Sequence, residues 1–235
     1  MLINLVKRSN EIELMDSEDL EESVLNIALS DISRVNKLLG GNSITIKSVF
    51  KEVYKIPTAR WSIMDIGCGD GEMLRQIANY ARKKKIKLQL IGIDTNTKCI
   101  DLAKRMSLKY PEIDYYTRDI LTLKEQDFRC DIIICTLTLH HFSNTQIKKI
   151  LQKSIAMVST AIIINDIHRS IWSYYLFKLF SAFFIKGYVA KNDGLVSIKR
   201  GFKKRELIQF SKELQLKKYQ LHWRWVFRYR WVIIK

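Results

Sequence analysis

Proline and cysteine are scarce in this chain of 235 residues, which contains 2 prolines, 9 glycines and 4 cysteines. So little proline and glycine argues against long linkers or disordered segments. The cysteines form no C-x-x-C pair, so we expect neither a disulfide framework nor a metal site. The first residues also lack the apolar stretch of about 7–15 residues that a signal peptide needs. Together these absences predict a reduced, cytoplasmic protein.

Acidic residues are outnumbered, since 40 Lys and Arg against 24 Asp and Glu give a formal net charge of +16. Such an excess is typical of proteins that bind nucleic acids or anionic membranes. It would also arise from lysines spread over solvated faces, such as the run 83–85 after a predicted helix. We favour this second interpretation and expect no nucleic-acid partner.

Short apolar runs and helical patterns alternate through the middle of the sequence. The predicted strands are 62–66, 88–93, 113–117, 131–137 and 161–166, and the predicted helices are 71–83, 97–108 and 145–157. This α/β alternation indicates a parallel sheet with helices on both faces, whose ligands bind at the carboxyl ends of the strands. A further helix is expected at 203–214, and the runs 219–226 and 228–234 are expected to form a hairpin that closes the sheet.

Residues 1–57 precede this core and are predicted to form an N-terminal helical lid. Acidic residues between 11 and 22 are expected to open a helix, and apolar residues from Leu25 to Val35 continue it at helical spacing. A second helix is expected at about 43–54, with Pro57 as its stop. Residues 58–235 are expected to form the main domain, so that the chain is effectively a single domain.

The most informative motif joins the first predicted strand to its helix, Asp65-Ile66-Gly67-Cys68-Gly69-Asp70-Gly71. Glycines at alternate positions let the backbone turn sharply and approach a ligand, and the helix N-terminus offers N–H groups to it. The spacing is neither the G-x-G-x-x-G of a dinucleotide fold nor a phosphate loop. It resembles motif I of class I S-adenosylmethionine-dependent methyltransferases. That resemblance implies a seven-stranded, mainly parallel, Rossmann-like sheet and S-adenosylmethionine as the cofactor.

Further candidates for the cofactor site lie at the carboxyl ends of the strands that follow. Asp94 ends the second strand, where one carboxylate can accept from both hydroxyls of a ribose; its alternative role is the N-cap of the following helix. By the family resemblance, Asp119 accepts from the adenine amino group and Ile120 packs on the ring. By the same resemblance, Asp65 holds the methionine part, and Leu137 or Thr136 borders it. The remaining members of the expected cofactor-binding set are Gly67, Cys68, Gly69, Gly71 and Thr95.

The fourth strand leads into a segment that ends in His140 and His141. This segment lacks the N/D-P-P-Y/F pattern of nucleic-acid amino-methyltransferases. A histidine, with a pKa of about 6.5, is suited to take the proton of an attacking phenol, whose own pKa is about 10. His140 is the first candidate for this base and His141 the second; alternatively, the pair caps the next helix. Asp166, after strand five, is expected to orient a histidine or to bind a substrate hydroxyl.

Three further stretches resemble bacterial small-molecule methyltransferases associated with type III polyketide synthases. They are Glu13–Asp16, Arg34–Gly41 and Asn192–Phe202. Leu195 departs from the pattern, because that family usually has proline there. The resemblance implies a phenolic or polyketide-like, hydrophobic acceptor, with transfer to oxygen favoured over transfer to a ring carbon.

An aromatic segment spans 171–185, within a region at 169–202 that the resemblance predicts to be a helical substrate cap. Such a cap would enclose an aromatic small-molecule acceptor. A plain core helix and a helix that contacts an anionic membrane weakly are the alternatives. For the whole protein, the competing interpretations are an RNA or protein methyltransferase that uses the basic surface and a binding protein without activity. Either a monomer or a homodimer is expected.

Overall fold

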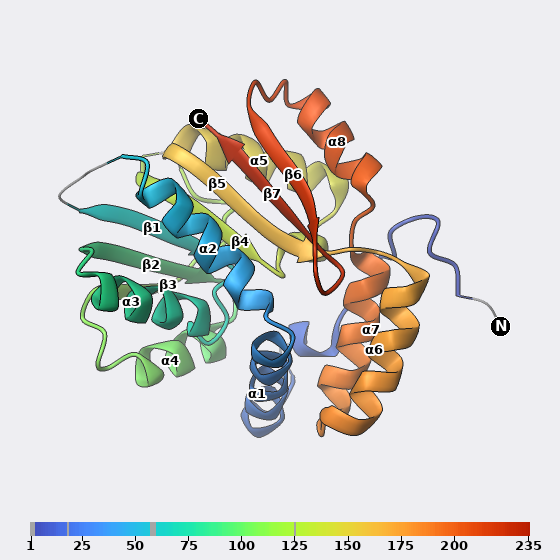
Figure 1. Cartoon of the computed structure of the whole chain (residues 1–235). Coiled ribbons are helices and arrows are strands. Elements are labelled where there is room, and N and C mark those ends of the chain that lie inside the picture. Colours follow the sequence, from blue (N-terminus) through green and yellow to red (C-terminus); the bar gives the residue numbers. More distant parts are fainter. Residues whose placement is uncertain (1–2, 18, 57–59, 125) are drawn as a thin grey trace.

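The computed structural model describes residues 3–17, 19–56, 60–124 and 126–235. Its centre is a seven-stranded sheet with the order β3-β2-β1-β4-β5-β7-β6 (Figure 1). The strands are β1 (Trp61–Ile66), β2 (Leu88–Asp94), β3 (Ile113–Thr117), β4 (Cys130–Thr136), β5 (Val158–Ile167), β6 (Tyr219–Arg224) and β7 (Arg228–Ile234). The first five pair in parallel, and β7 runs antiparallel to its neighbours β5 and β6. The predicted fold, including the C-terminal hairpin, is confirmed.

Helices cover both faces of the sheet. The helices of the described residues are α1 (Glu22–Leu38), α2 (Gly41–Val53), α3 (Glu72–Lys84), α4 (Thr97–Met106), α5 (Asn144–Met157), α6 (Ile171–Phe184), α7 (Tyr188–Arg200) and α8 (Lys204–Glu213). Side chains of α2, α3 and α4 share one buried cluster with the strands, and side chains of α5 and α8 share another. Each of these two groups of helices therefore covers one face of the sheet.

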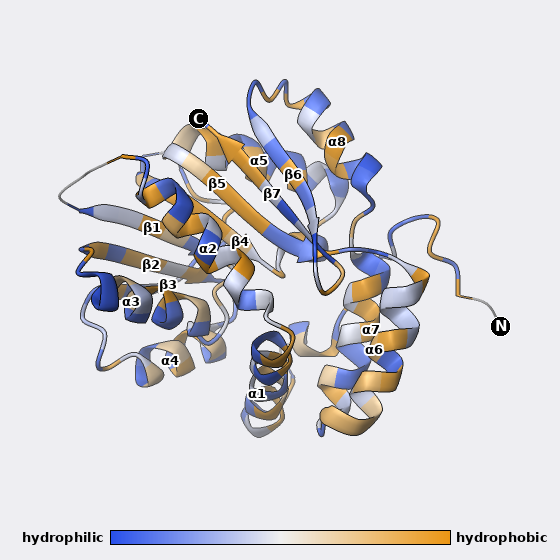
Figure 2. Cartoon of the chain, in the orientation of Figure 1, coloured by the Kyte–Doolittle hydropathy of each residue, from blue (hydrophilic) through white to orange (hydrophobic). Residues whose placement is uncertain are grey.

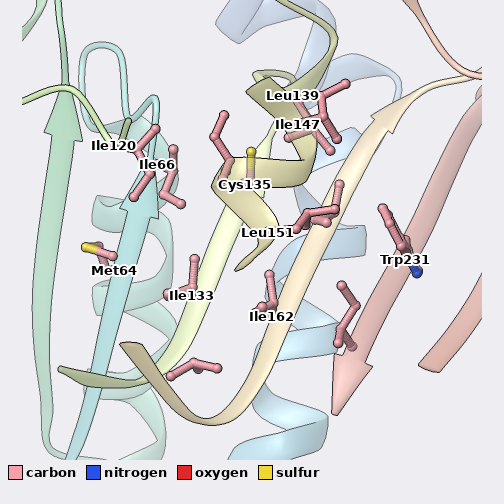
Figure 3. Packing of buried hydrophobic residues seen from close by; sticks show 14 of the residues in the cluster. Met64, Ile66, Ile120, Ile133, Cys135, Leu139, Ile147, Leu151, Ile162 and Trp231 are labelled. Carbon is pink, nitrogen blue, oxygen red and sulfur yellow. The ribbon is translucent and has the colours of Figure 1, made fainter. Parts of the chain in front are cut away.

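The strand β4 shows how the sequence divides its apolar residues between the two faces. Ile132 and Ile134 belong to the cluster under α2, α3 and α4, whereas Ile133 and Cys135 belong to the cluster under α5 and α8. Successive side chains of a strand point to opposite faces, so a continuous apolar run fills both clusters. Figure 3 shows Ile133 and Cys135 of the second cluster beside Leu151 of α5.

The N-terminal segment departs from the helix predicted at 11–22. Its described residues contain only a short 3-10 helix, Leu14–Asp16, and α1 begins at Glu22. The N–H groups of Leu14 and Met15 donate to the carboxylate of Asp193 on α7, at 2.8 and 2.9 Å. The helix prediction is wrong here because these N–H groups bond to a distant side chain instead of forming helix bonds.

Other predicted boundaries also shift by a few residues. The strand predicted at 219–226 ends at Arg224, so Trp225 lies in the turn between β6 and β7. The second N-terminal helix, α2, ends at Val53, and Pro57, its expected stop, lies outside the described residues. α2 packs on β5 and β7, so it contributes to the core layer of the sheet.

Beyond β5, helices α6 and α7 lie side by side and project away from the sheet, close to α1 (Figure 1). They approach closely at Gly194, where an added Cβ would lie 2.1 Å from the ring of Phe177. Figure 2 shows hydrophobic residues along α6. No helix in the described parts of the chain is long and apolar enough to cross a membrane.

Candidate active site

The turn between β1 and α3 is built by three glycines in the left-handed backbone region. Gly67, Gly69 and Gly71 have φ angles of +70°, +53° and +77°. An added Cβ would lie 2.3 Å from Thr138 at Gly67 and 2.2 Å from Tyr115 at Gly71, so these two glycines permit close packing. At Gly69 the nearest atom would be 4.0 Å away. Gly67 and Gly69 line a large cavity, whereas Gly71 packs against Tyr115 beneath the turn.

Asp94 ties the glycine turn to the end of β2. Its carboxylate accepts hydrogen bonds from the N–H groups of Gly69 and Asn96, both at 2.9 Å, and burial raises its pKa. The N-cap of α4 is Asn96, whose side chain accepts from Cys99 N–H at 3.3 Å. The alternative role of Asp94 as that N-cap is therefore wrong. Each bonded oxygen keeps a second lone pair, and the residue lines the cavity.

Asp119 follows β3, and its Oδ1 accepts from Leu121 N–H at 2.8 Å, which fixes the turn. Thr136 ends β4, and its hydroxyl lies 2.9 Å from the hydroxyl of Thr45 on α2. The remaining predicted cofactor residues that border the same cavity are Cys68, Thr95 and Ile120. Apart from Gly71, the structure thus brings the expected cofactor set to one edge of the sheet.

The surroundings of Asp65 indicate whether this edge of the sheet fits S-adenosylmethionine. The residue is buried, it lines the cavity, and its Oδ1 has no hydrogen-bond partner among the described residues. Burial and then the charge of Asp94 raise the pKa of Asp65 well above its usual range. A cationic ligand beside these two carboxyl groups would offset their repulsion. S-adenosylmethionine carries a sulfonium and an ammonium, so the residues present fit it.

The cavity extends well beyond this edge and has a volume of about 1010 Å³. Its other walls come from α1, α6, α7 and the β6–β7 turn, and they include Leu29, Phe177, Phe180, Phe183 and Trp225. Ligand pockets typically measure about 300–1,000 Å³. This cavity therefore has room for a cofactor and an apolar acceptor together.

The two histidines after β4 lie in different surroundings. His140 is buried, and its Nδ1 lies 2.7 Å from Asp166 Oδ1, while its Nε2 lies 3.4 Å from Glu13 Oε1. His141 is partly exposed, and its Nδ1 lies 3.0 Å from Asp16 Oδ2. Both histidines line the cavity. Two carboxylate–histidine pairs thus stand side by side, with Glu13 next to both rings.

Burial strongly lowers the pKa of His140, but the carboxylates of Asp166 and Glu13 outweigh it and raise that pKa to about 9. For Asp166 the two effects have the opposite direction. Burial raises the pKa of its carboxyl group, and the charge and hydrogen bond of His140 lower it below its usual value. At neutral pH the His140–Asp166 pair is therefore an imidazolium bound to a carboxylate.

Glu13, His140 and His141 place their ligand atoms within 4.8 Å of one another, a spacing that a metal ion would also need. Each group has other partners, however: Ser197 donates to Glu13 at 2.7 Å, and the histidines contact Asp166 and Asp16. We interpret the cluster as an ion-pair network, and the absence of a metal stays a prediction.

Sequence reasoning missed the residues that hold this network. Glu13 and Asp16 occur in a stretch that the family resemblance singled out, but nothing local indicated that they meet the histidines. Arg8 donates to the carbonyls of His140 and Phe142, both at 2.9 Å, and Arg200 donates to that of His140 at 3.2 Å. These two arginines come from distant parts of the sequence, and their hydrogen bonds hold the segment after β4 in place.

Comparisons of the sequence show which known proteins this chain resembles. Residues 63–160 match the family described as a methyltransferase domain. Ubiquinone biosynthesis O-methyltransferase of Rickettsia bellii is 26% identical over 153 residues, which are 63% of this chain and 56% of that protein. The chain therefore matches just over half the length of this curated relative.

Solved structures share the fold. Plantazolicin methyltransferase BpumL, in complex with SAH, superposes with a TM-score of 0.69 at 16% identity, over 94% of this chain and 92% of that one. Magnesium protoporphyrin IX methyltransferase from Synechocystis PCC 6803, with bound SAH, gives 0.59 at 16% identity, over 86% and 87%. The CurJ carbon methyltransferase gives 0.64 at 18% identity, over 92% and 61%.

These findings agree with the topology of the sheet. The chain has the Rossmann-like fold of class I S-adenosylmethionine-dependent methyltransferases, and residues 63–160 match the family described as a methyltransferase domain.

Proposed function

We propose that this protein transfers a methyl group from S-adenosylmethionine to an oxygen of a small hydrophobic acceptor of phenolic or polyketide-like chemistry. One observation carries the proposal. A single cavity is lined by the glycine turn and Asp94, by His141, and by the aromatic side chains of α6. The site can therefore hold a polar nucleoside cofactor and an apolar acceptor in contact with the same histidine.

The cofactor supplies a methyl group activated on a sulfonium. Asp94 would accept from the two ribose hydroxyls, since its oxygens have free lone pairs. Asp119 would accept from the adenine amino group, and Ile120 would pack on the ring. Asp65 would face the positive charge of the methionine part, and Thr136 would border it. Alignment of the reacting groups is the main contribution that this site makes, worth up to about 7–11 kcal/mol.

We assign the proton transfer to His141 rather than to His140, the first choice from sequence. At a pKa of about 9, His140 is already protonated at neutral pH and cannot accept a proton. His141 lines the cavity, and Asp16 beside its Nδ1 favours the tautomer whose Nε2 is free to accept. Its Nε2 lies 3.7 Å from Glu13, which would stabilise the imidazolium that forms. Asp166 positions His140, and His140 in turn positions Glu13.

The acceptor end of the cavity supports an aromatic or lipid-like substrate. Phe177, Phe180 and Phe183 supply an apolar wall from α6, and residues of α1 also line the cavity. We propose that 169–202 acts as the substrate cap and that α1 acts as the lid. The names of the relatives, which concern ubiquinone biosynthesis, plantazolicin and a magnesium porphyrin, are compatible with a small organic acceptor. The four buried, free cysteines support a reducing cytoplasmic location.

The test is methyl transfer from labelled S-adenosylmethionine to a panel of alkyl phenols and alkylresorcinols, with mass analysis of the products. The His141→Asn variant should lose about 10²–10⁴-fold in kcat, because general base catalysis contributes about that much. Its affinity for S-adenosylhomocysteine should not change. His222→Asn is the matched control, since His222 is exposed on β6. Unchanged turnover in His141→Asn, or methylation of carbon alone, would contradict the proposal.

A further inference from the structure

One face of α6 carries a stripe of large apolar side chains. Trp172, Tyr175, Leu176, Leu179 and Phe183 are 70%, 43%, 48%, 61% and 77% exposed. Their spacing follows the helical repeat, so they form one face. We call this set the α6 stripe. Soluble proteins rarely expose so much contiguous apolar surface unless a partner covers it.

The charge around the stripe is of one sign. No acidic residue occurs from Ile167 to Asn192, and Lys178 and Lys186 are exposed beside the stripe. The whole chain has a formal net charge of +16. An anionic surface would neutralise these lysines, whereas a second copy of the chain would bring them against one another.

The stripe is also continuous with the candidate active site. Leu176, Leu179 and Phe183 belong to the stripe and line the cavity. Trp225, in the β6–β7 turn, is 68% exposed and lines the same cavity. An apolar surface therefore runs without interruption from the outside of α6 into the cavity wall. Exposure of a hydrophobic molecule to water is unfavourable. Along this surface such a molecule could reach the cavity without that exposure.

We propose that the α6 stripe docks this protein on the surface of an anionic lipid bilayer and that the hydrophobic acceptor enters the cavity from the bilayer. α6 has 14 residues, so it is about 21 Å long, and it would lie in the plane of the interface with its apolar face towards the acyl chains. Lys178 and Lys186 would lie at the level of the lipid phosphates.

The experiment is co-sedimentation of the full-length protein with vesicles of phosphatidylcholine alone and with vesicles that also contain an equal share of phosphatidylglycerol. The wild type should bind the mixed vesicles, less so as salt is raised, and bind phosphatidylcholine weakly. Trp172→Glu should weaken binding by about tenfold or more, since it removes a large apolar side chain from the stripe and places a negative charge against the anionic bilayer. Trp172 does not line the cavity.

Leu108→Glu is the matched control, because Leu108 is 86% exposed beyond the end of α4 and should not contact the bilayer. Calorimetric titration with S-adenosylhomocysteine shows that each variant is folded, whatever its vesicle binding. The proposal is overturned if the wild type does not bind the mixed vesicles or if Trp172→Glu binds them as Leu108→Glu does. A dimer that dissociates in Trp172→Glu, without vesicle binding, would instead assign the stripe to a second copy.

Discussion

Stability should fall as pH rises through the titration of His140. The pKa of this residue is raised from 6.5 to about 9 in the folded protein, because the carboxylates of Asp166 and Glu13 outweigh the effect of burial. The charged ring is thus favoured in the folded state. The stabilisation is fully present below pH 6.5, where both states are protonated, and it is lost as pH approaches 9.

The size of the effect follows from the shift. One pKa unit corresponds to about 1.4 kcal/mol, so the free energy of unfolding should fall by about 3 kcal/mol between pH 6.5 and pH 9. Denaturant unfolding at several pH values in this window measures it, and an NMR titration of the His140 ring measures the pKa directly. His140→Gln should be less stable at pH 6.5 and should lose most of the pH dependence, while His222→Gln should keep it.

A flat stability profile of the wild type between these pH values would refute the reasoning, as would an NMR titration of His140 near its ordinary pKa. Either result would show that the two carboxylates do not outweigh the effect of burial on the pKa of this ring. It would also return His140 to the position of candidate base, because an imidazole that is neutral at pH 7 can accept a proton.

Three further outcomes are expected. Gly71→Ala should cost about 2 kcal/mol or more of unfolding free energy in denaturant titration, because its Cβ would meet Tyr115 at 2.2 Å; Gly69→Ala, with 4.0 Å of space, should cost less, and equal losses would contradict the packing role. Glu13→Gln should reduce methyl transfer while cofactor affinity in calorimetry stays the same, and unchanged turnover would remove Glu13 from the site. Incubation with a chelator should leave methyl transfer unchanged; activity that is lost and then restored by a divalent cation would show that the Glu13 cluster holds a metal.

The cofactor end of the site could be predicted because its signals are local. The glycines of motif I specify a turn with positive φ angles, and a carboxylate at the end of β2 follows from strand–helix alternation. Such patterns need only a few neighbouring residues to be interpreted. For this reason the sequence alone predicts that Gly67, Gly69 and Asp94 lie at the same edge of the sheet.

The acid–base cluster could not be predicted because its members come from distant parts of the chain. Asp16 meets His141 across 125 positions of sequence. The adjacent histidines also differ in burial, with side-chain exposures of 2% for His140 and 22% for His141, and no sequence pattern distinguishes them. Long-range bonds from the N–H groups of Leu14 and Met15 to Asp193 also explain why the described residues of 11–22 do not form a continuous helix.

The central claim is a cofactor site organised by Asp94, and calorimetric titration with S-adenosylhomocysteine tests it most directly. The wild type should bind, and Asp94→Ala should weaken binding by about 100-fold or more, since two hydrogen bonds to a charged group contribute about 3 kcal/mol or more. Asp114→Ala, an exposed carboxylate on β3, should bind as the wild type does. A folded wild type that does not bind, or an Asp94→Ala variant with unchanged affinity, would contradict the account.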